Sequence, residues 1–159
     1  MKIKIISVGK IKEKYLVNGI NEYLKRLTPY VKIEINEIPD EKASESLTQT
    51  QLNQIKDTEG KKILTKISDD DYVVALAIEG KQKSSEELAS FFNQHMIYNG
   101  RDIDFIIGGS NGLSEAVIRR SNELLSFSKF TFPHQMMRFI LLEQIYRSYK
   151  IIKNEPYHK

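Results

Sequence analysis

DFIIGGSNGLS, residues Asp104–Ser114, indicates the architecture of the whole chain. It has the pattern of a short buried strand, followed by a glycine-rich bend and then by the start of a helix. In open α/β sheets, ligands bind at such bends, outside the carboxyl ends of the strands. The stretch therefore predicts either a ligand site or a tight turn without a ligand, and the glycine spacing leaves both open.

The glycines of this bend match neither of two common nucleotide-binding motifs. A GxGxxG motif needs alternate glycines, whereas Gly108 and Gly109 are adjacent. A Walker A loop ends in Gly-Lys-Ser/Thr, whereas Leu113 follows Gly112. Both absences weigh against a nucleotide-binding enzyme. An ordinary Rossmann methyltransferase is also disfavoured, because Gly9 stands alone after the first strand. We therefore expect a ligand that the main chain holds in another way.

Strand and helix patterns alternate along the chain. Strands are predicted at Lys2–Val8, Val31–Ile38, Tyr72–Ile78, Ile103–Ile107 and Ser126–Thr131. Helices are predicted at Glu13–Leu27, at about Leu47–Ile67 with Gly60 as a potential break, from Ser84 to about Asn99, from Ser114 to about Ser121, and from Pro133 to about Ile152. This order predicts an α/β fold, a mostly parallel sheet with helices on both faces, in one domain of residues 1–159.

The composition is that of a globular protein, with 40% hydrophobic and 28% charged residues among 159. The chain has no cysteine, which excludes disulfides and thiolate metal sites and favours a cytoplasmic location. The amino-terminal apolar run is too short for a signal peptide, and no stretch approaches the ~18 apolar residues of a membrane span. We therefore expect no membrane partner. The three histidines are far apart in sequence, so we also expect no metal.

The net charge of +3 is unevenly distributed along the chain. Residues 1–32 carry eight Lys and Arg against two Asp and Glu, and residues 127–159 carry six against two. The middle, residues 33–126, carries ten against seventeen. Two basic ends that meet in space would suit a phosphate backbone, although surface lysines also serve solubility alone.

The segment after the glycine bend, Leu125–Arg138, combines three phenylalanines with several hydroxyl groups. Alternation of Phe130 and Phe132 is typical of a half-buried strand. Phenylalanine rings beside the bend also suit a flat base, whose edge main-chain groups would bind. The segment therefore predicts either a strand or the wall of an adenine pocket.

The last helix is apolar on more than one side, which indicates a second partner, most simply another copy of the chain. The alternative is a helix at the centre of a larger core. Arg138 and Arg147 on this helix either contact phosphates or pair with carboxylates such as Glu143. Beyond it, Tyr157 and His158 offer aromatic stacking and a titratable imidazole at the end of the chain.

Several blocks, taken in order, resemble the RlmH family of SPOUT-class rRNA methyltransferases. The opening Ile5–Lys10 and Pro39-Asp40 are similar to the family as well, so the likeness spans essentially the whole chain. The matching blocks are Phe105–Gly112, Leu125–Lys129, Thr131–Arg138, Glu143–Arg147 and Pro156–His158.

The resemblance implies a fold, a reaction and partners. The sheet would carry a carboxyl-terminal trefoil knot, an exception to the rule that chains avoid knots. S-adenosylmethionine would bind in the knot of a homodimer and donate a methyl group. The target would be N3 of a pseudouridine in 23S rRNA of the large subunit, within the assembled ribosome. A ribosome-binding factor without catalytic activity is the alternative.

The resemblance also assigns roles to residues. Leu76, Gly108 and the run Phe127–Phe132 would contact the cofactor, and Gly109 next to them would allow its close approach. That run comprises Phe127, Ser128, Lys129, Phe130, Thr131 and Phe132. From their chemistry we expect His158, together with Tyr157 and Arg147, to form the catalytic group, in which His158 or a nearby group accepts the N3 proton or His158 anchors the base. The alternative is a tail that only closes the cofactor pocket. Arg138 and Arg147 are expected to hold substrate phosphates.

Overall fold

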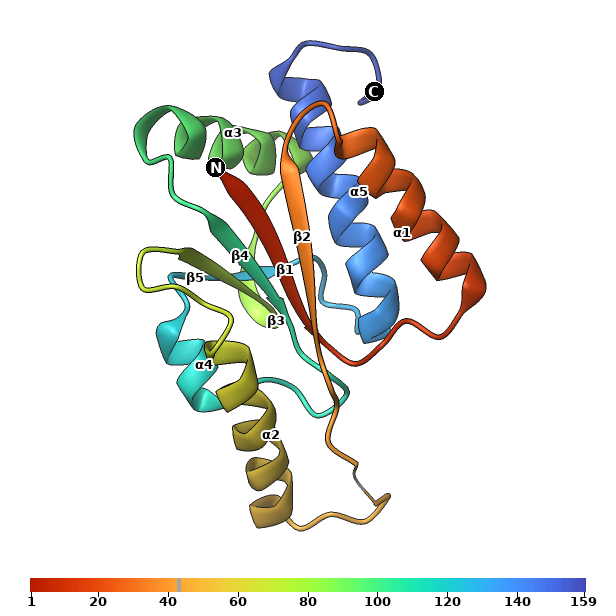
Figure 1. Cartoon of the computed structure of the whole chain (residues 1–159), viewed down its shortest axis with the longest axis vertical. Coiled ribbons are helices and arrows are strands. Elements are labelled where there is room, and N and C mark those ends of the chain that lie inside the picture. The colour runs from red at the N-terminus through yellow and green to blue at the C-terminus, as the bar shows by residue number, and fades with distance from the viewer. Residues whose placement is uncertain (43) are drawn as a thin grey trace.

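The structure is a computed structural model that describes residues 1–42 and 44–159. Five strands alternate with five helices, as the sequence pattern predicts (Figure 1). In chain order the elements are β1 (Lys2–Val8), α1 (Lys14–Leu27), β2 (Lys32–Ile38), α2 (Gln49–Leu64), β3 (Tyr72–Gln82), α3 (Ser85–Tyr98), β4 (Ile103–Ile107), α4 (Glu115–Arg120), β5 (Glu123–Ser126) and α5 (His134–Ile152).

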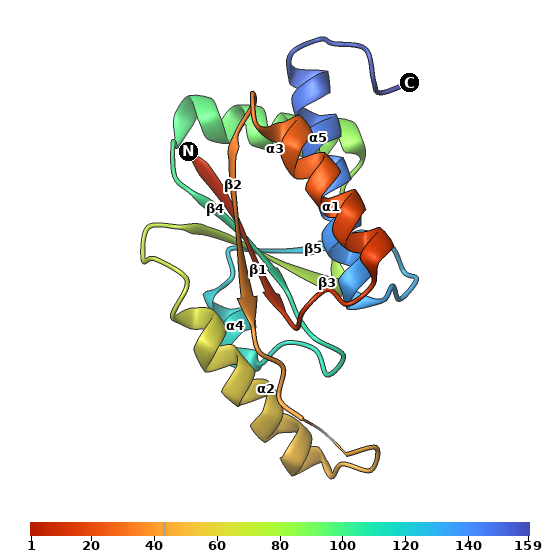
Figure 2. The ribbon, with the colours of Figure 1, turned by 45° about the vertical axis from the view of Figure 1, so that its right-hand side comes forward.

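The strands form one sheet in the order β2-β1-β4-β3-β5, and each pairing is parallel. Helices α1, α3 and α5 cover one face of the sheet, and α2 and α4 cover the other (Figures 1 and 2). The α/β class and the helices on both faces are thus confirmed. Because all strands point the same way, their carboxyl ends lie along one edge of the sheet, where open α/β sheets place ligands.

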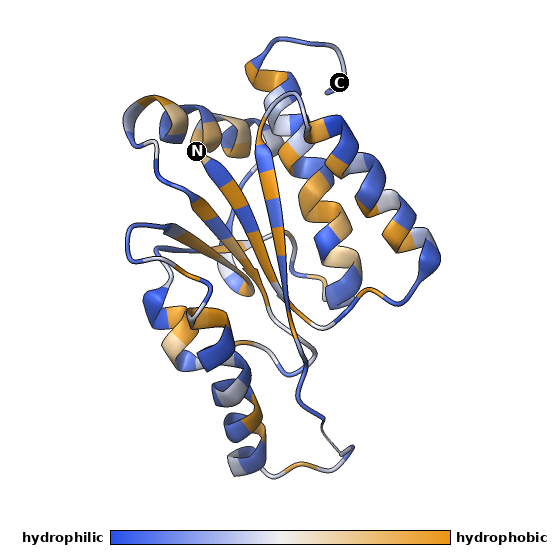
Figure 3. Cartoon of the chain, viewed as in Figure 1, coloured by the Kyte–Doolittle hydropathy of each residue, from blue (hydrophilic) through white to orange (hydrophobic). Residues whose placement is uncertain are grey.

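The central strands are apolar because both of their faces are covered. All five residues of β4 are buried, and its run of isoleucine and phenylalanine is typical of a strand between two helical layers. The outer strand β2 instead alternates between polar and apolar side chains along its length (Figure 3). The core therefore lies on both sides of β1 and β4, next to the residues that form the glycine bend.

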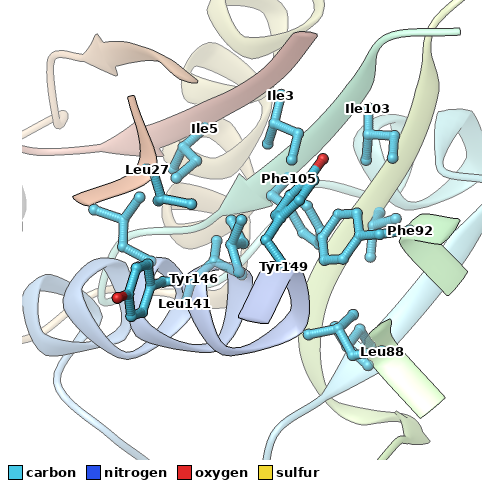
Figure 4. Packing of buried hydrophobic residues seen from close by; sticks show 14 of the residues in the cluster. Ile3, Ile5, Leu27, Leu88, Phe92, Ile103, Phe105, Leu141, Tyr146 and Tyr149 are labelled. Atoms are coloured by element: carbon cyan, nitrogen blue, oxygen red, sulfur yellow. The ribbon is translucent and has the colours of Figure 1, made fainter. Parts of the chain in front are cut away.

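Helix α5 lies between α1 and α3 on the sheet, and this position explains its unusually wide apolar surface. Leu141, Leu142 and Ile145 are completely buried, and Tyr149 stacks against Phe92 of α3 (Figure 4). The alternative of a central core helix is therefore correct for these residues. The excess of apolar residues on α5 no longer argues for a second copy of the chain.

The strand predicted at Ser126–Thr131 is wrong. Strand β5 lies earlier, at Glu123–Ser126, where Leu125 pairs with Leu76 of β3. The Ser126 hydroxyl then donates to the Ser128 carbonyl oxygen at 3.0 Å, and the Phe130 amide donates to the Ser128 hydroxyl. These local bonds compete with a sheet ladder and turn the chain away from the sheet.

Three other boundaries differ from the prediction. Pro133 is the N-cap of α5, one residue before the first turn in which it was expected. Helix α2 continues through Gly60, because Gly60 packs directly against the Ser114 side chain that caps α4. Strand β3 continues past Ile78 to Gln82, because Lys81 and Gln82 pair with β5 a second time.

The second pairing of β3 with β5 brings two main chains unusually close. The register shifts between Leu76 and Lys81, so residues 77–80 leave the ladder and return to it. A Cβ atom at Gly80 would lie only 2.7 Å from the carbonyl group of Leu124. Any other residue would clash there, so this close approach requires glycine. Residue Gly80 therefore lies directly against the main chain of β5.

A buried group of charges lies near the other ends of the strands. The Lys4 ammonium contacts the Asp71 carboxylate at 2.7 Å and the Asp104 carboxylate at 3.2 Å. One lysine cannot neutralise two carboxylates. Burial, and then the adjacent Asp71, raise the pKa of Asp104 from its ordinary 3.8 to about 7, against the attraction of Lys4.

Among the described residues, no helix is long and apolar enough to cross a bilayer.

The Asp104 carboxyl group should make the stability of the fold depend on pH. Its pKa is higher in the folded than in the unfolded chain, so the folded state binds more protons between about pH 4 and pH 7. The free energy of unfolding in urea should therefore fall as the pH rises through this window, by at most about 1.4 kcal/mol per unit. Asp104→Asn should flatten that dependence, whereas Asp57→Asn on the exposed face of α2 should leave it unchanged.

Candidate functional site

An open cleft of about 190 Å³ lies at the carboxyl ends of β3 and β4. Three segments that are distant in sequence form it. The middle of β3, where its pairing with β5 is interrupted, contributes Leu76. The glycine bend contributes Gly108 and Gly109, and the chain between β5 and α5 contributes the phenylalanine-rich segment Phe127–Phe132. The cleft is thus at the edge of the sheet where the topology of an α/β fold predicts a ligand.

The glycine bend brings main chain to the surface of the cleft. The Gly112 amide donates to the Gly109 carbonyl oxygen at 3.1 Å, with Gly112 at a φ of +85°. A Cβ atom would lie 3.0 Å from the Leu113 side chain at Gly108 and 3.1 Å from Val8 at Gly109. Gly108 and Gly109 therefore have little room for a side chain, and both line the cleft with their main chain.

The phenylalanine-rich segment forms the opposite wall of the cleft. Phe127 and Phe132 are partly buried, whereas 78% of Phe130 is exposed, although a large aromatic ring gains free energy by burial. Ile78 on the facing segment is 50% exposed. Two exposed apolar side chains on the rim of one cleft are typical of a site that covers an apolar ligand.

Eight of the nine residues predicted to bind the cofactor line this cleft; Lys129 does not, and its side chain is exposed. The sequence patterns did not identify Ile78, Leu113, His134 and Met137, which also line it. His134 and Met137 lie in the first turn of α5, which follows the predicted segment directly. The start of the helix after Pro133 is the signal that would have found them.

The three residues predicted to be catalytic lie together, but none of them lines the cleft. Glu143 of α5 joins them: its Oε1 atom accepts hydrogen bonds from the Arg147 guanidinium and, at 3.0 Å, from the Tyr157 hydroxyl. The Arg147 guanidinium also lies 4.8 Å from the centre of the Tyr157 ring and 3.1 Å from His158 Nδ1. The sequence identified Glu143 only as a potential partner for arginine.

The last residues of the chain are held in place by two other elements. His158 Nε2 lies 2.7 Å from a carboxylate oxygen of Glu86 on α3, and the two hydroxyls of Tyr157 and Tyr23 are 3.0 Å apart. The hydrogen bond with His158 lowers the pKa of Glu86. We call Glu143, Arg147, Tyr157, His158 and Glu86 the C-terminal network.

Contacts within the C-terminal network change the pKa values of Tyr157 and Arg147. Burial, and then hydrogen bonds with Tyr23 and Glu143, raise the pKa of Tyr157 far above its ordinary value, so its hydroxyl stays neutral and donates to Glu143. The Glu143 hydrogen bond raises the pKa of Arg147, which keeps its charge. Neither Tyr157 nor Arg147 is therefore a proton acceptor at neutral pH.

Arg138 occupies a different position from the one its predicted role requires. Only 4% of the residue is exposed, and its guanidinium donates to a Glu37 carboxylate oxygen at 2.8 Å and to the Gly9 carbonyl oxygen at 3.1 Å. These contacts tie α5 to the ends of β1 and β2. This placement argues against the predicted phosphate contact for Arg138 and supports the alternative of pairing with a carboxylate.

Comparison with known proteins identifies the family of the chain. A family model described as "Predicted SPOUT methyltransferase" matches residues 1–158. The chain belongs to the SPOUT methyltransferase family. It is similar along its full length, and along theirs, to proteins named ribosomal RNA large subunit methyltransferase H, at 59% identity for Bacillus cereus, 57% for Listeria monocytogenes and 56% for Enterococcus faecalis. The resemblance to the RlmH family is thus confirmed.

The residues of the cleft suit a methyl donor better than a metal. Leu76, Phe127 and Phe132 offer apolar walls to a flat base, and the glycine bend offers main-chain groups to its polar edge. Within residues 1–42 and 44–159, no three His, Cys, Asp or Glu side chains are grouped in a way that would hold a metal ion.

Glu143 should hold the end of the chain on α5. Glu143→Ala removes the acceptor that Arg147 and Tyr157 share, so residues 155–159 should exchange their amide hydrogens faster. Hydrogen exchange followed by mass spectrometry measures this directly. Glu115→Ala, an exposed carboxylate on α4, is the matched control and should leave that rate unchanged. Equal exchange in Glu143→Ala and the unmodified protein would show that Glu143 does not hold the tail.

Proposed function

We propose that the chain transfers a methyl group from S-adenosylmethionine to N3 of a pseudouridine in large-subunit 23S rRNA, within the assembled ribosome. The observation that carries this proposal is the cleft itself, which unites the glycine bend with the phenylalanine-rich segment in a chain that matches the SPOUT family from end to end. The relatives are named for methylation of large-subunit rRNA, and the finer details extend that reaction.

S-adenosylmethionine is proposed to bind in the cleft. The adenine would lie against Leu76 and the phenylalanine rings, with its polar edge on the main chain of residues 127–132 and of the glycine bend. The donor supplies a methyl group that its positive sulfur already makes electrophilic, so the reaction needs no metal. Close approach to Gly108 and Gly109 excludes water from one side of the donor.

The protein then has to align the reacting atoms and remove a proton. A bond forms between N3 and the methyl carbon as the carbon–sulfur bond breaks, and the sulfur keeps the electron pair. The N3 proton must leave, because a neutral imide nitrogen is a poor nucleophile. We propose that His158 accepts this proton at Nδ1 once Arg147 moves from that nitrogen to a substrate phosphate, while Nε2 keeps its hydrogen bond to Glu86 and Tyr157 positions both residues through Glu143.

Basic residues at the carboxyl edge of the sheet support an rRNA partner. Lys10, Lys12 and Lys14 are exposed on the segment that follows β1, and the Lys12 amide donates to the Gln135 side chain at the start of α5. Exposed Lys129 lies on the phenylalanine-rich segment but does not line the cleft. These lysines combine the two basic ends of the sequence into one region that suits phosphate groups.

Three further proposals accompany this function. The double pairing of β3 with β5 and the contact at Gly80 support a trefoil knot, in which residues 77–80 close a loop around the chain that leads to α5. The resemblance supports a homodimer, as does Tyr15 on α1, which is 63% exposed. A reaction on assembled ribosomes places the protein in the cytoplasm.

Methyl transfer to isolated ribosomes tests the proposed reaction. Purified protein, labelled S-adenosylmethionine and ribosomes from a deletion strain should yield one methylated pseudouridine in 23S rRNA, which mass spectrometry locates. Binding to ribosomes without methyl transfer would instead indicate the non-catalytic factor.

Gly109→Val tests the position of the donor. The branched side chain would collide with Val8 and displace the glycine bend, so calorimetry should show at least about a tenfold loss of affinity for S-adenosylmethionine. Ser110→Val, at the exposed neighbour of Gly109 that does not line the cleft, is the matched control and should leave the affinity unchanged. Unchanged affinity in folded Gly109→Val would place the donor elsewhere.

Sedimentation measures the proposed dimer. The protein should sediment at twice the mass of one chain at micromolar concentration, and Tyr15→Glu should shift it towards the monomer by placing a charge in the apolar contact. A stable monomer of the unmodified protein at that concentration would contradict the proposal.

A further inference from the structure

A second hollow, of about 350 Å³, lies beside the proposed donor cleft. The two share Leu125, Ser126, Phe127 and Phe132, so these residues separate a first compartment from a second. Its size is within the range of roughly 300–1,000 Å³ that is typical of small-molecule pockets. Two adjoining compartments suit a reaction in which a donor and an acceptor have to meet.

The lining of the second hollow is suited to a flat polar ring. Apolar side chains from three elements form its walls, and five polar residues also line it, among them Lys83, which is paired with Glu123. Two of the five, from α3 and α5, are hydrogen-bonded to each other. The walls include Leu88, Ile140 and the two phenylalanines, and the polar pair is Ser85 and Gln144.

The side-chain amide of Gln144 is held in a single orientation. The Ser85 hydroxyl donates to its Oε1 atom at 2.8 Å, and its Nε2 atom donates to a Glu143 carboxylate oxygen at 2.8 Å. Because the carboxylate only accepts hydrogen bonds, the amide nitrogen has to face Glu143. An amide has two N–H groups and two acceptor positions, so one of each is left for a ligand.

The same carboxylate links this amide to the C-terminal network. Glu143 accepts from Gln144 through one oxygen and from Tyr157 and Arg147 through the other. The hollow therefore lies between the proposed donor cleft and the residues proposed to take up the proton.

We propose that the second hollow receives the target base and that Gln144 distinguishes pseudouridine from uridine. This inference rests on the proposed function and adds to it the residue that reads the base. In pseudouridine the ribose is attached to carbon, so N1 keeps a hydrogen, whereas in uridine N1 carries the ribose. The free acceptor of Gln144 would bind that N1–H, and its free N–H would bind the neighbouring carbonyl oxygen at C2.

This pairing leaves the reacting atom accessible. N3 lies on the other side of the C2 carbonyl group, so an amide bound to N1 and C2 does not cover it. A site that has to bind an N–H group discriminates strongly against an analogue that lacks it, because its own acceptor is left unpaired. Gln144 is thereby a specificity residue that contacts the substrate, and Ser85 is a residue that positions it.

Two kinds of ribosome test the inference, one with pseudouridine and one with uridine at the target position. The unmodified protein should prefer pseudouridine in kcat/KM by at least about tenfold. Gln144→Ala should bring that ratio close to one, mainly by loss of activity on pseudouridine, while its affinity for S-adenosylmethionine stays within about twofold. Ser85→Ala should lower the ratio less, and it decides the question if Gln144→Ala does not fold.

Other outcomes would overturn the inference. A preference that persists in folded Gln144→Ala, or in Ser85→Ala where only that variant folds, would show that another group reads N1. Equal losses on both ribosomes, or a preference absent from the unmodified protein, would also exclude this role. Weaker binding of S-adenosylmethionine would make the hollow part of the donor site.

Gln94→Ala, exposed on α3, is the matched control. Failure of the unmodified protein on both ribosomes would instead refute the proposed function.

Discussion

The parallel pairing of β5 with β3 is the interaction on which the cleft depends. It places β5 at the edge of the sheet, next to β3, whereas α5 packs over the central strand β4, between α1 and α3. The chain between them has to return across the carboxyl ends of β3 and β4. That return carries Phe127–Phe132 past Gly108 and Gly109, and the cleft forms where the two segments meet. Without this pairing, each segment would be an ordinary surface loop.

Helix α5 connects the packed core to the proposed site, because it contributes residues to both. Its period of 3.6 residues places Leu141 and Leu142 in the core and, one and two residues later, Glu143 and Gln144 towards the surface. Glu143 then holds Arg147 and Tyr157, and Gln144 faces Ser85 of α3. Polar groups that a packed helix supports lose little conformational freedom when a ligand binds, which favours catalysis by preorganisation. The wide apolar surface of α5 thus stabilises the core and positions polar residues at once.

The sequence predicted the sheet and most of the cleft because both follow from local patterns. The apolar run of β4 predicts a buried strand, and the adjacent glycines predict a tight bend. The alternating order of strands and helices then predicts a ligand site at the carboxyl ends of the strands. The strand after Ser126 was mispredicted, because hydroxyl-to-backbone bonds there outweigh the alternation of phenylalanines. Burial of Arg138 and the shared carboxylate of Glu143 were beyond prediction, because both depend on contacts between residues distant in sequence. Gln144 gave no signal, since one glutamine on a helix is ordinary.

A crystal structure of the protein with S-adenosylmethionine tests the central claim most directly. We predict electron density for the donor in the cleft, with its base between Leu76 and the phenylalanine-rich segment, main-chain contacts from residues 127–132, and its methyl group directed towards the hollow at Gln144. Density for the donor at any other surface, or a cleft that side chains close when the donor is present at saturating concentration, would contradict the account.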